Sequence, residues 1–157
     1  SAECDIRLTK DGHWVLSHNS STSKMFWLDV EVEASTLEEL REFSYMSGAN
    51  FWEYEGLRIA TLDEYLDIFV GSKTRPQIEI KGDNIENVDF SASGFYMWYE
   101  SLKSIDVTGC PKLKTVNVYR YDTSWGDESS LDTLYMTAAQ AETVQVTKRD
   151  KVQIVVK

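Results

Sequence analysis

The chain has 157 residues, the size of a single domain or of two very small ones. Its 26 acidic and 16 basic residues give a formal net charge of −10 at pH 7, which disfavours binding to nucleic acid or to an anionic membrane surface. No apolar run approaches the length of about 18 residues that a membrane span needs. Cys4 and Cys110 form neither a metal-binding pair nor a disulfide framework, so we expect two buried thiols.

A β-hairpin is predicted at the start of the chain. Apolar and polar residues alternate from Glu3 to Leu8, which is the period of a strand. The Asp-Gly pair at residues 11–12 is a strong turn signal, and "HWVLS" then returns as a second strand that ends at His18. Glu3 and Asp5 therefore lie on one face of the first strand. In isolation, these carboxylates are also explained as solvent-facing side chains.

Two helices and a strand follow the hairpin. Residues 35–46 carry a capping box at Ser35 and Glu38, with an apolar stripe that contains Leu37, Leu40 and Phe43. Residues 61–70 repeat the pattern with a box at Thr61 and Glu64. "RPQIEIK", at residues 75–81, predicts a strand. The order strand, helix, strand is typical of an α/β protein.

The sequence changes character after residue 82. Helix signals fade, and apolar spacing of the β type replaces them. The stretch 101–118 fits the leucine-rich repeat template, whose apolar positions would be Leu102, Ile105, Val107, Cys110, Leu113, Val116 and Val118. The opening of this unit recurs at residues 131–136, and residues 142–157 predict two further strands. We therefore divide the chain into 1–82, a junction at 83–100, and 101–157. We interpret the aromatic run at 94–100 as core packing.

The first 82 residues resemble the opening section of the glycerophosphodiester phosphodiesterase family. The matching pieces are Glu-x-Asp followed by "LTKDG", a returning strand that ends in a histidine, "LEEL", "RIATLDEYL" and "EIK". The resemblance implies a TIM-type barrel with its site at the carboxyl ends of the strands. It also implies a small glycerophosphodiester as substrate and a divalent metal, calcium or magnesium, as cofactor.

The same resemblance assigns a role to five residues. Glu3, Asp5 and Glu79 would bind the metal, which fits the preference of these ions for carboxylate oxygens. His18 would match one of two catalytic histidines, and Lys81 would hold the phosphate. The metal would polarise a phosphoryl oxygen while histidines exchange protons with the attacking and leaving groups.

This chain departs from the family pattern at the first strand. The His-Arg pair of that strand, and the Glu-Asn-Thr segment after it, are absent upstream of Glu3. The second histidine of the chain, His13, directly follows the turn and is separated from His18 by about 16 Å of strand. That distance is too long for both to share one phosphate, so we expect His13 at the surface. The abrupt opening on strand-like sequence leaves room for an upstream leader or segment.

Residues 101–157 resemble the leucine-rich repeats and terminal cap of bacterial cell-surface proteins, which usually bind partners or space other domains. We therefore expect a partial TIM-barrel-like βα segment followed by a β-rich, leucine-rich-repeat-like segment, located in the bacterial periplasm or at the cell surface. The first functional hypothesis is a metal-dependent hydrolase of glycerophosphodiesters with an incomplete catalytic set. The second is a non-catalytic binding or structural module, whose partner would be a protein bound by the C-terminal half. A third is a fusion of pieces from two proteins.

Overall fold

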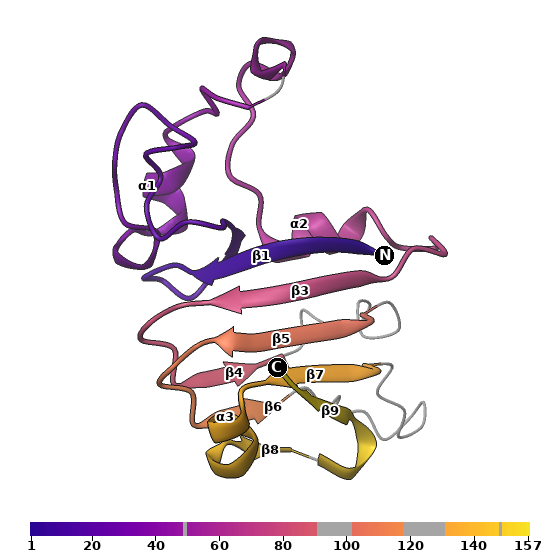
Figure 1. The fold of residues 1–157 in the computed structure, drawn as a ribbon. Helices are drawn as coiled ribbons and strands as arrows, with labels where there is room; N and C mark the ends of the chain where they lie inside the picture. The colour runs from indigo at the N-terminus through magenta and orange to yellow at the C-terminus, as the bar shows by residue number, and fades with distance from the viewer. Residues whose placement is uncertain (49, 91–101, 118–130, 148) are drawn as a thin grey trace.

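Figure 1 shows the computed structural model, which describes residues 1–48, 50–90, 102–117, 131–147 and 149–157. The aromatic run at residues 94–100 and Val118 of the predicted apolar ladder lie outside the described residues. Within the described ranges, no helix is long and apolar enough to cross a membrane.

The described strands form a larger sheet of six and a smaller sheet of three. The order of the larger sheet is β2-β1-β3-β5-β7-β9, and that of the smaller is β4-β6-β8. β1 and β2 pair antiparallel as the predicted hairpin, and all other pairs are parallel. The bounds are β1 Ala2–Leu8, β2 Trp14–Leu16, β3 Pro76–Lys81, β4 Asn87–Asp89, β5 Ser104–Gly109, β6 Thr115–Asn117, β7 Thr133–Met136, β8 Gln145–Val146 and β9 Gln153–Val156. The predicted α/β class is confirmed, with a mostly parallel sheet.

One apolar core joins the two sheets. From β3 onward, successive strands alternate between the two sheets. In the larger sheet, neighbouring strands place Ile78, Ile105 and Leu134 in register, where they form one apolar row. Val88 and Val116 of the smaller sheet belong to the same buried cluster. Burying each such side chain contributes about 1.5–3 kcal/mol relative to leaving it in water. Because one face of the larger sheet is used by this core, its other face is left for polar residues.

The larger sheet runs without interruption from β3 to β5, so it crosses the predicted junction at residues 83–100. The division of the chain there stays a prediction. Among the described residues the sheet is open, with β2 and β9 as its edges. Cys4 and Cys110 are buried free thiols, as expected, and burial raises the pKa of each to about 12.

Among the described residues, three short α-helices each begin with a capping box. They are α1 Leu37–Arg41, α2 Leu62–Asp67 and α3 Ala138–Thr143. The predicted box at Thr61 is confirmed, but the one at Ser35 and Glu38 was wrong by one residue: Thr36 caps α1 together with Glu39. The hydroxyl of Ser35 instead donates to the carbonyl of Glu31, 2.8 Å away. The sequence analysis missed α3, which is capped by Thr137 and Gln140.

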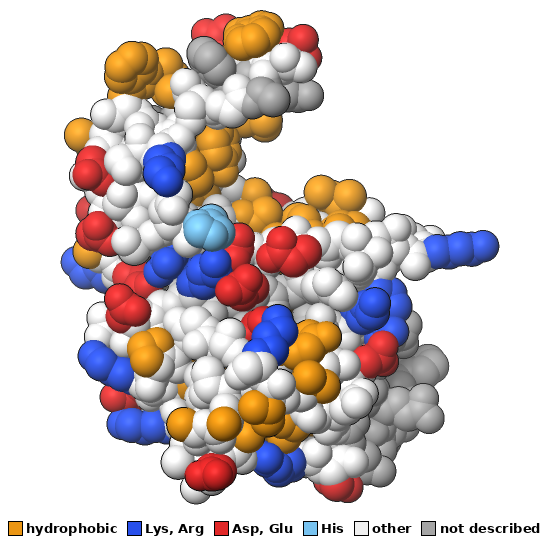
Figure 2. All heavy atoms as spheres, in the orientation of Figure 1, with side chains coloured by type: hydrophobic (Ala, Val, Ile, Leu, Met, Phe, Trp, Pro, Cys, Tyr) orange, Lys and Arg blue, Asp and Glu red, His pale blue; other side chains and the backbone are white. Residues whose placement is uncertain are grey.

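Residues 19–48 and 50–60 form an arm that stands beyond β1 in Figure 1. The arm contains α1 and two 3-10 helices, η1 Val32–Ala34 and η2 Phe51–Tyr54. A second, smaller core made of Val15, Phe26, Val32, Leu40 and Ile59 holds it together. Figure 2 shows that the surface is hollowed between the upper part of the arm and the body of the molecule.

Candidate metal centre

The polar face of the larger sheet carries the predicted site. β1 and β3 are parallel neighbours, and their register places Asp5 opposite Glu79 and Glu3 opposite Gln77. Since side chains alternate along a strand, these residues project on the side opposite the buried Cys4, Ile6, Ile78 and Ile80. The parallel pairing thus brings together carboxylates that are more than 70 positions apart in the chain.

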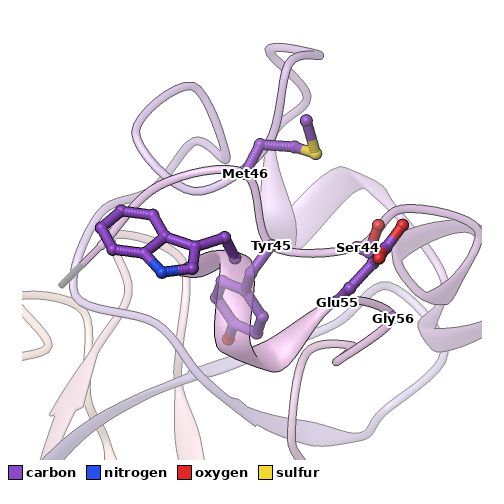
Figure 3. Close-up of a pocket in the computed structure, with 6 residues that line it drawn as sticks. Ser44, Tyr45, Met46, Glu55 and Gly56 are labelled. Carbon is purple, nitrogen blue, oxygen red and sulfur yellow. The ribbon is translucent and has the colours of Figure 1, made fainter. Parts of the chain in front are cut away.

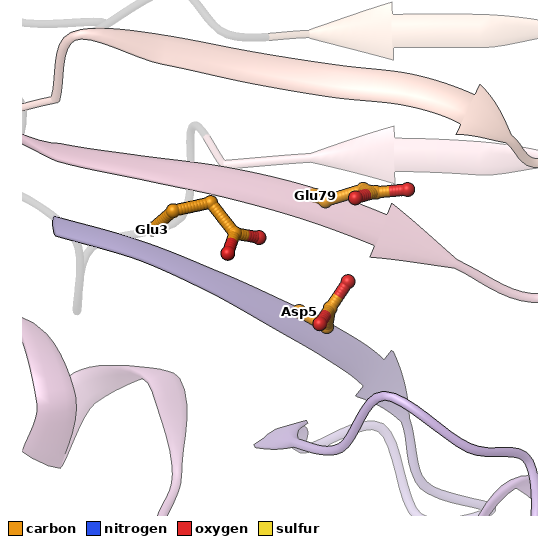
Figure 4. Close-up of side chains that lie close together, drawn as sticks. All are labelled: Glu3, Asp5 and Glu79. Atoms are coloured by element: carbon orange, nitrogen blue, oxygen red, sulfur yellow. The ribbon is translucent and has the colours of Figure 1, made fainter.

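Three carboxylates meet at this position. Oxygen atoms of Glu3, Asp5 and Glu79 all lie within 4.8 Å of one another. Figure 4 shows the three side chains projecting from β1 and β3 into a common space. Glu3 is exposed, whereas Asp5 and Glu79 are half-buried. Oδ1 of Asp5 is buried, and Nζ of Lys81 lies 2.9 Å from it as an ion-pair partner. A carboxylate oxygen has two lone pairs, so this contact leaves one for a metal ion.

Lys81 supplies a positive charge beside the cluster. Its Nζ lies 2.9 Å from Oδ1 of Asp5 and 3.5 Å from Oε1 of Glu79. A bulge sets this position, because the register between β3 and β5 shifts after Glu79 and places Lys81 opposite Gly109. The side chain can therefore reach across to β1. Lys81 is the only one of the five predicted site residues that carries a permanent positive charge, so it balances part of the carboxylate charge.

The electrostatics of the cluster show mutual repulsion. Partial burial, together with the charges of Asp5 and Glu79, raises the pKa of Glu3 above its usual value of 4.5. Partial burial alone would lower the pKa of Lys81, but the carboxylates of Asp5 and Glu79 raise it above its usual value. The cluster as a whole favours bound positive charge.

His18 lies at the edge of this site rather than within it. It follows β2, it is exposed, and its Nδ1 lies 3.3 Å from Oδ1 of Asn19. The guanidinium of Arg7 donates to its carbonyl, which fixes the backbone there. The ring is near enough to Glu3 to lower the pKa of that carboxyl slightly against the larger effects that raise it. His13 lies at the hairpin turn beside Asp11, and its side chain is 53% exposed, so its predicted surface position is confirmed.

A cavity of about 100 Å³ adjoins the cluster and contains residues that the sequence analysis missed. Glu3 and Glu79 line it together with Asp106 of β5, Tyr135 of β7 and Lys157, which follows β9. The register places Asp106 directly opposite Glu79 and Tyr135 opposite Asp106. The signal for Asp106 was its position between the apolar residues Ile105 and Val107, which predicts the polar face. Nothing in the sequence indicated which strand it would lie beside.

A larger cavity of about 220 Å³ lies in the arm. Ser44, Tyr45, Met46, Trp52, Glu55 and Gly56 line it, and Figure 3 shows Tyr45, Met46 and Glu55 around the opening. It shares no lining residue with the three carboxylates. We therefore assign the candidate site to the sheet face and not to the arm.

The fold and the cluster define an α/β protein with a candidate divalent-metal centre on its parallel sheet. The sequence model of the glycerophosphoryl diester phosphodiesterase family matches residues 1–122. A glycerophosphodiester phosphodiesterase of Caldanaerobacter subterraneus subsp. tengcongensis is 35% identical over 80 residues, which cover 50% of this chain and 32% of that protein. The chain belongs to the glycerophosphoryl diester phosphodiesterase family, and its match spans about a third of the length of this curated relative.

Solved structures of phosphodiesterases have a fold similar to that of this chain. A phosphodiesterase of Oleispira antarctica, in complex with the product sn-glycerol-3-phosphate, is similar with a TM-score of 0.52 at 16% identity, over 92% of this chain and 70% of that chain. A structure from Agrobacterium tumefaciens gives a TM-score of 0.51 at 14% identity, over 97% and 79% of the two chains. The family match crosses the predicted junction and ends at residue 122, and the comparisons give no support to the leucine-rich repeat likeness of residues 101–157.

Proposed function

We propose that Glu3, Asp5 and Glu79 bind one divalent cation and that this centre serves the hydrolysis of glycerophosphodiesters. The observation that carries the proposal is the convergence of three carboxylates from two parallel strands, within 4.8 Å of one another. Family membership supports the metal dependence, since enzymes of this family generally use a divalent metal. The substrate class is supported by the named activity of the relative from Caldanaerobacter subterraneus.

The donor set favours a hard cation. All three ligands are carboxylates, which suit calcium and magnesium and do not suit soft metals. Calcium binds oxygen at about 2.3–2.6 Å in a flexible geometry, whereas magnesium demands about 2.0–2.1 Å and a stricter one. Both ions suit this all-carboxylate donor set. A cation here would also relieve the repulsion that raises the pKa of Glu3.

The surrounding residues would position the phosphate. When bound, the metal would polarise a phosphoryl oxygen of the diester. Lys81, which faces Asp5 and Glu79, would attract the phosphate charge and hold it against the cluster. His18, at the exposed edge near Glu3, would hold or release a proton at a ring nitrogen as the leaving alcohol departs.

One histidine at the site implies slow hydrolysis. His13 lies at the far end of β2 from His18 and pairs with Asp11, so it cannot serve as the second acid–base group of the same phosphate. The loss of one positioned acid or base typically lowers the rate by about 10²–10⁴-fold. We therefore expect activity above the uncatalysed rate but well below that of an enzyme with a complete pair.

The test is a hydrolysis assay on the purified chain. Release of sn-glycerol 3-phosphate from glycerophosphoethanolamine and glycerophosphoglycerol is followed with and without calcium or magnesium. The proposal predicts metal-dependent release that is lost in Glu79→Gln and retained in Glu86→Gln, a matched change at an exposed carboxylate that pairs with Lys114. Release of sn-glycerol 3-phosphate that does not depend on metal, or that persists in Glu79→Gln, would contradict the proposal.

A further inference from the structure

A second group of polar residues lies beside the carboxylate cluster and already holds an ammonium group. Nζ of Lys157 lies 2.5 Å from Oδ2 of Asp106 and 4.2 Å from the ring centroid of Tyr135. A carboxylate and an aromatic face are together the usual recognition elements for an ammonium ion. Here they come from neighbouring strands, at the same level of the sheet as Glu79.

Asp106 is held in place independently of Lys157. The backbone N–H and the hydroxyl of Thr108 both donate to Oδ1 of Asp106, at 2.9 and 2.6 Å. These bonds fix the carboxyl orientation and leave Oδ2 to accept from the ammonium. Burial alone would raise the pKa of Asp106, but the bonds from Lys157 and Thr108 lower it below its usual value. The carboxylate is therefore charged and oriented at neutral pH.

The two partners of this ion pair differ in their exposure. The Asp106 side chain is 11% exposed and that of Lys157 is 53% exposed. The exposed ammonium of Lys157 can leave the carboxylate for water at little cost in free energy, because ion pairs of exposed lysines contribute little. The buried carboxylate of Asp106 keeps its position in the sheet. The adjoining cavity of about 100 Å³, which Glu3 and Glu79 share with the metal cluster, gives a ligand access to the same position.

We propose that Asp106 and Tyr135 form a subsite for an ammonium group on the alcohol part of the phosphodiester, and that Lys157 occupies this subsite until such a ligand displaces it. The assignment to a phosphodiester rests on the proposed function, whereas ammonium binding does not. Oδ2 of Asp106 accepts an N–H, so a primary ammonium gains both the hydrogen bond and the ring contact. A quaternary ammonium has no N–H to donate and gains only the ring contact.

The charges around the subsite predict which alcohols it rejects. Once Lys157 leaves, the charged carboxylate of Asp106 faces the cavity. An anionic alcohol would meet its like charge, and a neutral alcohol could not replace the ion pair that Lys157 forms with Asp106. The subsite therefore favours ethanolamine-type alcohols over glycerol and over acidic alcohols.

The experiment is a nuclear magnetic resonance titration of the full chain in metal-free buffer, with ethanolamine, choline and glycerol as separate probes. In Lys157→Met, ethanolamine should shift the amides of Asp106, Thr108 and Tyr135, with an affinity about tenfold higher than in the wild type, a difference of about 1.4 kcal/mol. Choline should bind more weakly and glycerol should cause no shift there. The shifts should vanish in Asp106→Asn combined with Lys157→Met. Lys114→Met, which removes an exposed lysine paired with Glu86, should behave as the wild type.

Equal affinities in Lys157→Met and the wild type, or shifts that persist without Asp106, would overturn the proposal. So would the failure of both Lys157→Met and Lys157→Gln to fold, because the lysine would then be a fixed structural partner. The titration uses neither metal nor diester. Ethanolamine binding without hydrolysis would therefore support the subsite and contradict the proposed function, while hydrolysis without ethanolamine binding would do the reverse.

Discussion

Glu3→Gln should lower the thermal stability of this protein in calcium but not in metal-free buffer. In metal-free buffer, the charged Glu3 is repelled by Asp5 and Glu79, and its pKa is raised above 4.5 in the folded state. A carboxyl whose pKa is higher in the folded than in the unfolded state stabilises the fold fully at a pH below its unfolded-state pKa. This stabilisation is lost as the pH rises through its folded-state pKa. At pH 7, removal of the charge should therefore leave the melting temperature unchanged or slightly higher.

In calcium, the variant should be less stable than the wild type. A ligand at 100 times its Kd stabilises the folded state by about 2.7 kcal/mol. For a chain of this size each kcal/mol moves the melting temperature by about 2–4 °C, so the wild type should gain about 5–10 °C. If the loss of one of three carboxylates weakens binding about tenfold, the same calcium concentration stabilises the variant by only about 1.4 kcal/mol.

The assay is a pair of thermal melts at pH 7, with chelator and then with calcium, on the wild type and Glu3→Gln. Glu86→Gln is the matched control, because it removes an exposed carboxylate that lies outside the cluster and pairs with Lys114. The control should show the full calcium shift. An equal shift in Glu3→Gln and the wild type would refute the argument that Glu3 is a ligand.

Three other outcomes follow from the fold. Gly109→Ala should lower the free energy of unfolding in urea by about 1–3 kcal/mol, because a Cβ there would lie 2.8 Å from the carbonyl oxygen of Ile80. It should also reduce the shift of the melting temperature by calcium, because this bulge positions Lys81. Wild-type stability of the variant would argue against a tight bulge. Gln140→Leu should cost about 2–4 kcal/mol, since the buried amide donates at 2.9 Å to the carbonyls of both Val107 and Cys110. A buried carbonyl left without a hydrogen bond costs about 1 kcal/mol or more. A smaller loss of stability in Gln140→Leu would therefore mean that water replaces the amide as the donor. Asp106→Asn should be less stable than the wild type at neutral pH, and the difference should shrink below pH 3.8, because the lowered pKa of Asp106 makes its stabilisation disappear as pH falls through the folded value; a difference that persists unchanged in acid would contradict the ion pair.

The elements with local signals could be predicted from the sequence. The alternation from Glu3 to Leu8 and the Asp-Gly turn fix the hairpin, and Thr61 with Glu64 fixes the start of α2. The start of α1 was wrong by one residue because both Ser35 and Thr36 have a glutamate three positions later. The choice between them depends on a contact outside the helix, namely the bond from the Ser35 hydroxyl to Glu31.

The pairing of distant strands could not be predicted. The carboxylates of β1 and β3 were connected through a family resemblance, and the structure then placed them in register. Asp106, in contrast, lies 51 residues from Lys157, and no local pattern indicates that β9 pairs with β7 and returns that lysine to β5. The subsite therefore emerges only from the order of the strands in the sheet.

The most direct test of the metal centre is a crystal structure of the chain soaked with manganese, which takes the same oxygen ligands as calcium and magnesium and is located by its anomalous scattering. The account predicts one anomalous peak, at about 2.0–2.6 Å from carboxylate oxygens of Glu3, Asp5 and Glu79 together. A peak bound to other carboxylates, while Lys81 still pairs with Asp5 and Glu79, would contradict the central claim.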